Sequence, residues 1–171
     1  MAISMYDVAV PVFNQQLKNL SGLLDKASAH AQAKQFDVSV LLQARLYPDM
    51  FPLTRQVQIA CDAAKYGVAR LTGTEAPTSE DKEVTVDELK ARIAATLAFV
   101  NSVPRERFDG VESRKVEVPV RTQTYTFDGR TFLLHWSMPN FFFHVTTAYD
   151  LLRHNGVEVG KRDFLGQVPQ A

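Results

Sequence analysis

Residues 139–156, PNFFFHVTTAYDLLRHNG, carry the pattern that decides the fold. Apolar side chains recur there at three- and four-residue steps, which is the period of a helix with one buried face. Pro139 suits a first helical turn, and the pair Asn155 and Gly156 suits a left-handed C-terminal cap. We therefore predict a helix over this stretch, with Ser137 as a candidate N-cap.

Three further segments show the same helical period. They extend from residue 5 to about 29, from 52 to 71 and from 85 to 104. Capping boxes predict the starts of the first and third, Ser4 with Asp7 and Thr85 with Glu88. Pro11 lies two turns inside the first segment and leaves open a kink or a later start. A short helix is predicted over residues 38–46, and residues 72–84 have the composition of an exposed loop.

A change of period precedes the last helix. Residues 115–120 and 122–127 alternate apolar and polar side chains, as strands do. Asp128 and Gly129 form a strong two-residue hairpin signal, with residues 130–134 as the return strand. The sequence thus predicts a mainly α protein: a four-helix bundle with a small β-hairpin inserted before the last helix, as one domain over residues 1–171.

Composition narrows the classes of partner. Lysine plus arginine and aspartate plus glutamate both number 19, so the formal net charge is zero. This balance argues against nucleic acid and an anionic membrane surface as partners. The single cysteine, Cys61, forms no internal disulfide, and no secretion signal or membrane span is present, so we expect a cytoplasmic location. On its helix Cys61 is predicted to be a small buried side chain.

Three polar residues fall on predicted apolar faces. They are His144 on the last helix, Gln56 on the second long helix and Gln16 on the first. A buried polar group without a partner costs about 1–3 kcal/mol, so these three are expected to meet each other, a water molecule or a ligand. Tyr47 and Asp49 precede the second long helix and are further candidate ligand contacts, although Asp49 suits a helix cap better.

Other polar residues leave alternatives open. His135 can face the pocket or solvent, because alternation alone does not decide which way it points. Asp62 falls on the polar side of its helix and is predicted to be solvated or to bond a cap. Phe143 projects to the polar side of the last helix, where it suits a contact with the hairpin or with a partner chain.

Three long motifs resemble a known family. They are ARLYPDMFPL at residues 44–53, PNFFFHVTTAY at residues 139–149 and GKRDFLG at residues 160–166. Together they are similar to a bacterial family of unknown function in the DinB/YfiT-like superfamily, over nearly the whole chain. The resemblance implies a four-helix bundle of DinB type, a homodimer, and a pocket at one end of the bundle.

The superfamily also implies a metal site from which this sequence departs. In its members three histidines usually hold a divalent ion, one on the second helix and two a turn apart on the last helix. Here only His144 matches, because Ala148 stands one turn later and Gln56 occupies the approximate place of the ligand on the second helix. The resemblance therefore implies a degenerate metal triad in a pocket that keeps its shape.

Three hypotheses of function follow from these residues. In the first, Gln16, Tyr47, Asp49, Gln56 and His144 hold a small polar ligand without chemistry. In the second, His144, His135 and an aspartate bind a divalent metal such as zinc or nickel, in a hydrolase or a thiol-dependent transferase. In the third, the buried polar residues form a core network that sets the register of the helices.

Overall fold

Both predicted capping boxes form, and each sets the start of a long helix. In the computed structural model, which describes residues 3–167, the Ser4 hydroxyl accepts the Asp7 N–H at 3.2 Å and the Thr85 hydroxyl accepts the Glu88 N–H at 3.2 Å. The long helices are α1 (Met5–Lys34), α3 (Leu53–Thr72), α4 (Val86–Ser102) and α6 (Met138–His154). The shorter elements are α2 (Ser39–Gln43), η1 (Arg105–Phe108), η2 (Val111–Ser113), β1 (Lys115–Val120), β2 (Gln123–Asp128), α5 (Gly129–Thr131), η3 (Phe132–Ser137) and α7 (Lys161–Leu165).

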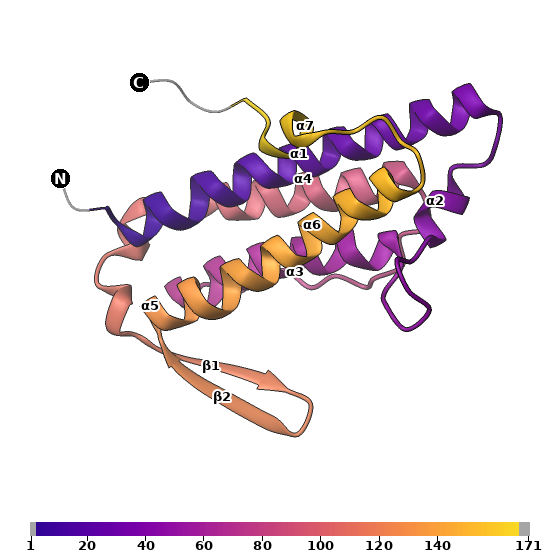
Figure 1. Cartoon of the computed structure of the whole chain (residues 1–171). Coiled ribbons are helices and arrows are strands. Elements are labelled where there is room, and N and C mark those ends of the chain that lie inside the picture. The colour runs from indigo at the N-terminus through magenta and orange to yellow at the C-terminus, as the bar shows by residue number, and fades with distance from the viewer. Residues whose placement is uncertain (1–2, 168–171) are drawn as a thin grey trace.

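The four long helices lie side by side as an elongated bundle (Figure 1). α1 and α6 run in one direction, and α3 and α4 run in the other. Their inward faces share one continuous apolar cluster, with Phe13, Leu53, Leu89 and Phe141 among its fully buried members. The β1–β2 hairpin extends from one end of the bundle, and α2 lies at the opposite end (Figure 1). The predicted mainly α bundle with a hairpin before the last helix is confirmed.

The parallel direction of α3 and α4 explains the segment between them. An α-helix of 20 residues, the length of α3, spans about 30 Å, and the chain must return along that length before α4 begins. Residues 74–84 make this return, and they contain no helix or strand. A segment of this length reaches so far only when it is nearly extended.

The hairpin turn lies elsewhere than predicted. β1 pairs with β2 with Val120 opposite Gln123, so the turn is Arg121–Thr122, and Arg121 adopts a left-handed φ of 52°. Asp128 is instead a helix cap, accepting the Thr131 N–H at 2.7 Å. A Cβ on Gly129 would lie 2.0 Å from the Val111 carbonyl oxygen, so close packing against η2, and not a turn, requires glycine there.

The last helix is consequently longer than predicted. It continues from α5 through the wider turns of η3 into α6, where a return strand was expected over residues 130–134. Burial of Phe132 and Leu133 against the core favours the helical course. Ser137 lies inside this helix and does not cap it; its hydroxyl donates to the Ala63 carbonyl at 3.4 Å. The predicted end at Gly156 is confirmed, with φ at 84° and the Val157 N–H bonded to Leu152 O.

Other boundaries differ in smaller ways. α1 begins at Met5 and continues past Pro11, which is exposed, so the later start does not occur. The short helix is confined to α2. After α6 the chain returns along α1, where Asn19 donates to the Phe164 carbonyl at 2.8 Å.

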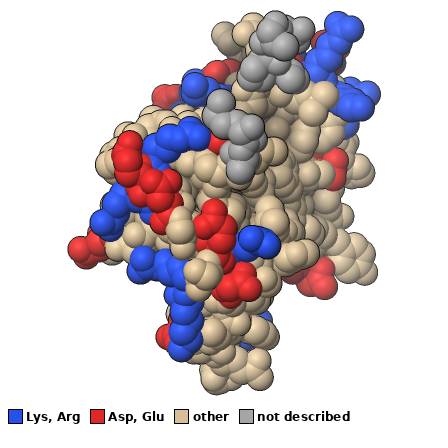
Figure 2. Space-filling model, turned by 90° about the vertical axis from the view of Figure 1, so that its left-hand side faces the viewer, with Lys and Arg blue, Asp and Glu red and all other residues tan. Residues whose placement is uncertain are grey.

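The surface is mixed in charge. Figure 2 shows lysine and arginine interspersed with aspartate and glutamate on the face that carries the hairpin end, as the zero net charge leads one to expect. Between residues 3 and 167, none of the helices combines the length and the hydropathy needed to span a bilayer.

Candidate ligand-binding site

Packing of α3 against α6 brings two of the predicted polar residues together. The Nδ1 atom of His144 lies 2.7 Å from Oε1 of Gln56, and both side chains are buried. The Gln56 Nε2 atom donates to the Phe51 carbonyl at 3.0 Å, which orients the amide so that its oxygen faces the imidazole. An amide oxygen only accepts, so the proton lies on Nδ1 of His144 and Nε2 keeps its lone pair.

Burial keeps this imidazole neutral. Loss of solvation, with a smaller contribution from the positive charge of Arg55, lowers the pKa of His144 from 6.5 to about 4. At neutral pH the ring therefore presents Nε2 as a hydrogen-bond acceptor. Nε2 forms no hydrogen bond with the described residues, and it is not fully buried.

Exposed aromatic side chains lie next to this pair. The ring of Phe143 meets the His144 ring edge to face at 5.2 Å between centroids, and Phe143 is 56% exposed. This confirms the prediction that Phe143 projects outward. Phe51, whose carbonyl orients Gln56, is 53% exposed, and the Arg55 guanidinium lies 6.0 Å from the centre of its ring. His144 thus has one exposed ring packed against its imidazole, and a second exposed ring belongs to the residue whose carbonyl orients Gln56.

The remaining predicted ligand contacts do not join His144. Gln16 is buried on α1, and its Oε1 atom has no hydrogen-bond partner among the described residues. The expected trio of polar side chains is therefore a pair. Tyr47 is 66% exposed, Asp49 is exposed on the same loop, and neither forms a hydrogen bond with His144 or Gln56.

The predicted metal ligands also lie apart. His135 is exposed on η3, nine residues before His144 on one continuous helical segment, which places them about 13 Å apart along the axis. Within residues 3–167 no three histidine, cysteine, aspartate or glutamate side chains are grouped for a metal ion. One imidazole beside a carboxamide does not fit the three or four strong donors that zinc or nickel needs.

A second polar assembly lies on the other side of α3, and the sequence prediction missed it. Arg92 of α4 is buried, with its Nη1 atom 2.6 Å from Asp81 and 3.0 Å from Glu83, and its Nη2 atom 2.9 Å from Asp62. The signal was Arg92 itself, which stands on the apolar face of its helix between Leu89 and Thr96. We call Arg92, Asp62, Asp81, Glu83 and Lys65 the Arg92 cluster.

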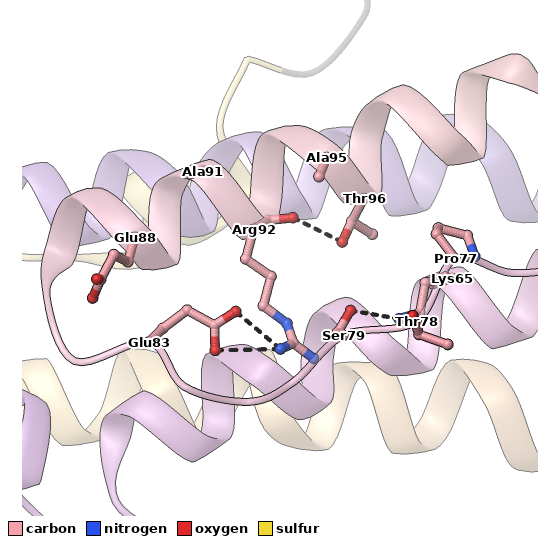
Figure 3. Close-up of a pocket in the computed structure, with 10 residues that line it drawn as sticks. All are labelled: Lys65, Pro77, Thr78, Ser79, Glu83, Glu88, Ala91, Arg92, Ala95 and Thr96. Carbon is pink, nitrogen blue, oxygen red and sulfur yellow. Dashed lines mark hydrogen bonds and ion pairs between the residues drawn. The ribbon is translucent and has the colours of Figure 1, made fainter.

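The cluster ties residues 74–84 to the bundle. Lys65 of α3 is 2% exposed and donates to the Ser79 hydroxyl at 2.8 Å, while its Nζ atom lies 3.1 Å from Asp62. The prediction that Asp62 is solvated or caps a helix is therefore wrong. Polar contacts from α3 and α4 hold the segment in place (Figure 3), and most of its residues are exposed, as predicted.

Ionisation in the cluster follows from these contacts. Partial burial raises the pKa of Asp81, but hydrogen bonds from Arg55 and Arg92 outweigh it, so the net shift is downward. Glu83 shows the same balance, with its own backbone N–H, Arg92 and Gln58 as donors. Nearby Cys61 behaves differently: burial raises the pKa of its thiol to about 12, so it stays protonated, and its predicted burial is confirmed.

Four long helices with this connectivity, and a hairpin before the last, define a DinB-like helical bundle. A crystal structure of a DinB family member from Shewanella denitrificans matches it with a TM-score of 0.93 and 47% sequence identity, covering 98% of this chain and 94% of that one. A family model described as a domain of unknown function (DUF1993) matches residues 5–165. The chain belongs to this family. No curated protein matches the sequence.

Proposed function

We propose that the protein binds a small polar molecule at Nε2 of His144, as a metal-free descendant of the DinB metal site. The observation that carries this proposal is the bond between His144 Nδ1 and Gln56 Oε1, which leaves Nε2 as an oriented acceptor. A ligand that suits it has an O–H or N–H group for Nε2. Its apolar part packs against the exposed rings of Phe143 and Phe51.

Two properties of the His144 site favour binding over catalysis. A general base works best when its pKa lies near the working pH, and the pKa of His144 is lowered to about 4. A hydrolase or transferase with a divalent metal needs further ligands, and the donors beside His144 do not supply them. The metal-dependent alternative thus depends on donors that the described residues do not bring to His144.

The first experiment measures ligand-dependent melting. Wild type, His144→Ala and the matched control His154→Ala, an exposed histidine on the same helix, are screened against small phenols, alcohols and amides. We expect a binding compound to raise the Tm of wild type and of the control, but not of His144→Ala. A compound that stabilises all three proteins equally would exclude His144 from the site.

The same variant separates binding from the core-network hypothesis. A ligand site predicts that unliganded His144→Ala loses no more than the about 1–3 kcal/mol that an unpaired Gln56 Oε1 costs, whereas a core network with further members predicts a larger loss. A second measurement, elemental analysis after incubation with zinc or nickel and dialysis, tests the metal alternative. Stoichiometric metal in wild type that is absent from both His144→Ala and His135→Ala would overturn the metal-free proposal.

A further inference from the structure

The β1–β2 hairpin has two open edges, because among the described residues its strands pair only with each other. Val120 and Gln123 flank the two-residue turn, so they exchange both of their backbone hydrogen bonds, and every second pair along the hairpin does the same. The residues between these pairs direct their backbone N–H and C=O groups away from the hairpin. They are Lys115, Glu117 and Pro119 on β1 and Thr124, Thr126 and Asp128 on β2.

The outward edge of β1 opposes the addition of another strand. Pro119 has no N–H to donate, and Lys115 and Glu117 place a charged pair there, with 2.6 Å between Nζ and Oε1. If two copies met through this edge around Glu117, the two carboxylates would lie opposite each other, which is unfavourable. Charged side chains and proline are common means by which proteins keep edge strands from pairing.

The outward edge of β2 lacks this protection. Residues 123–127, QTYTF, carry no charge and are rich in side chains that favour strands. Thr124 and Thr126 are exposed, and within residues 3–167 no backbone group outside the hairpin bonds them. β2 is also the edge of the hairpin that lies farther from the helices (Figure 1). Because two strands alone are only marginally stable in water, a further strand would stabilise this hairpin.

The sequence of β2 matches a second copy of itself. When two β2 strands run antiparallel with Tyr125 on the two-fold axis, Thr124 of each copy lies opposite Thr126 of the other, and each such pair exchanges two backbone hydrogen bonds. The two Tyr125 rings then lie opposite each other, a favourable cross-strand pair. At each end Asp128 of one copy lies near Arg121 of the other, so opposite charges flank the uncharged centre.

We propose that two copies of this chain associate through β2, in antiparallel register about Tyr125, and form a four-stranded sheet between two helical bundles. The same residues contribute from each copy, so the contact closes as a dimer and does not propagate. The outer strands of that sheet are the two β1 strands, whose edges are protected. Paired strands of this length bury less surface than the about 1,600 Å² of a standard interface, so we expect the dimer to dissociate on dilution.

Sedimentation velocity over a range of concentrations tests the proposal. Thr126→Pro removes an outward N–H from β2 and leaves the hydrogen bonds between β1 and β2, and Glu117→Pro removes the outward N–H directly opposite, on β1. We expect the dissociation constant of the dimer to rise at least about tenfold in Thr126→Pro and to stay unchanged in the control. The single tryptophan, Trp136, lies 5.3 Å from Tyr125 between ring centroids, so its fluorescence shows whether each variant keeps the hairpin in place.

A disulfide cross-link tests the register. Tyr125→Cys places a thiol on the two-fold axis, where facing Cα atoms lie about 4.5 Å apart, which a disulfide can bridge. Gln123→Cys is the control, because its two copies lie four residues apart along the strands, about 13 Å. Cys61 is buried, and we expect mild oxidation to give a covalent dimer of Tyr125→Cys and far less of Gln123→Cys.

The two experiments contradict the proposal in different ways. A wild-type monomer at all concentrations, or equal association of wild type and a Thr126→Pro variant with wild-type fluorescence, would overturn pairing through β2. Equal cross-linking of the Tyr125→Cys and Gln123→Cys variants would overturn the register. The cross-linking comparison decides by itself if Thr126→Pro loses the hairpin.

Discussion

Helix α3 carries two polar assemblies that differ in kind. Toward α6 it supplies Gln56 to one neutral hydrogen bond with His144. Toward α4 it supplies Asp62 and Lys65 to a charged cluster around Arg92. The first joins two regular helices, whereas the second needs carboxylates from a segment without regular structure. The neutral pair suits a site that accepts a hydrogen bond from a ligand. The charged cluster is suited to holding a segment of the chain in place.

Arg55 connects the two assemblies. Its Nη1 atom lies 2.5 Å from Asp81 of the Arg92 cluster, and its positive charge contributes to the low pKa of His144. A change in the charge of Asp81 is therefore expected to alter the pKa of His144 through Arg55.

The largest expected effect is the loss of Arg92. Arg92→Met leaves Asp62, Asp81 and Glu83 close together without their shared cation, so we expect the free energy of unfolding to fall by about 3–5 kcal/mol. Urea denaturation measures this change. Arg92→Lys is the control: it keeps the charge but not the forked geometry, and an intermediate loss is expected. A loss below about 1 kcal/mol for Arg92→Met would show that the cluster does not hold the fold.

The next largest effect is a dependence of stability on pH, which distinguishes the His144–Gln56 pair from the Arg92 cluster. Folding lowers the pKa of His144 from 6.5 to about 4, so the unfolded state binds more protons between these values. The contribution of neutral His144 to the free energy of unfolding is fully present above pH 6.5. It decreases by about 2–3 kcal/mol as the pH falls toward 4. His144→Asn keeps a donor for Gln56 but does not titrate, and denaturation at several pH values should show a flatter profile for it.

The carboxylates of the Arg92 cluster act in a lower window. The pKa values of Asp81 and Glu83 are lowered from 3.8 and 4.5, so their contribution is present above these values and is lost as the pH falls through the lowered ones. This loss is expected in wild type and in His144→Asn alike. Equal slopes for the two proteins between pH 4 and 6.5 would contradict the assignment to His144.

A smaller effect tests the connection through Arg55. Asp81→Asn removes one partly exposed ion-pair partner, so we expect a loss of about 1 kcal/mol. Arg55 then carries less compensated charge, and the pKa of His144, followed by NMR titration, should fall further. Glu80→Gln, on the same segment and with exposed Lys82 as its ion-pair partner among the described residues, is the control with no expected shift. An unchanged His144 pKa in Asp81→Asn would separate the two assemblies.

The smallest effect on stability is expected at the rim of the His144 site. Phe143 is more than half exposed, so Phe143→Ser should change the free energy of unfolding by less than about 0.5 kcal/mol. Its affinity for a compound that binds wild type should nevertheless fall. Sedimentation velocity of wild type and this variant also tests the predicted homodimer, and a wild-type monomer at all concentrations would contradict it.

Much of the fold could be predicted because its signals are local. Capping pairs such as Ser4 with Asp7, the helical period of residues 139–156 and the cap at Gly156 each act within a few residues. The prediction failed at Asp128 and Gly129 because this pair suits a hairpin turn and a helix start equally. Packing against Val111 decided between them.

The polar residues of the two assemblies were likewise predictable only in part. Gln56 and His144 were found because a polar residue on an apolar helical face is visible in the sequence, and a helix pair then brings them within 2.7 Å. Asp81 and Glu83 were missed because the 74–84 segment has no period that shows which side chains face inward.

The sequence by itself determined where the long helices lie, which faces they bury and that a complete histidine triad is lacking, because these properties depend on spacing and residue type. Only the tertiary structure decided which polar residues meet. That choice depends on helix direction: with α3 and α4 parallel, the connecting segment must return along the bundle, and it carries its carboxylates to Arg92.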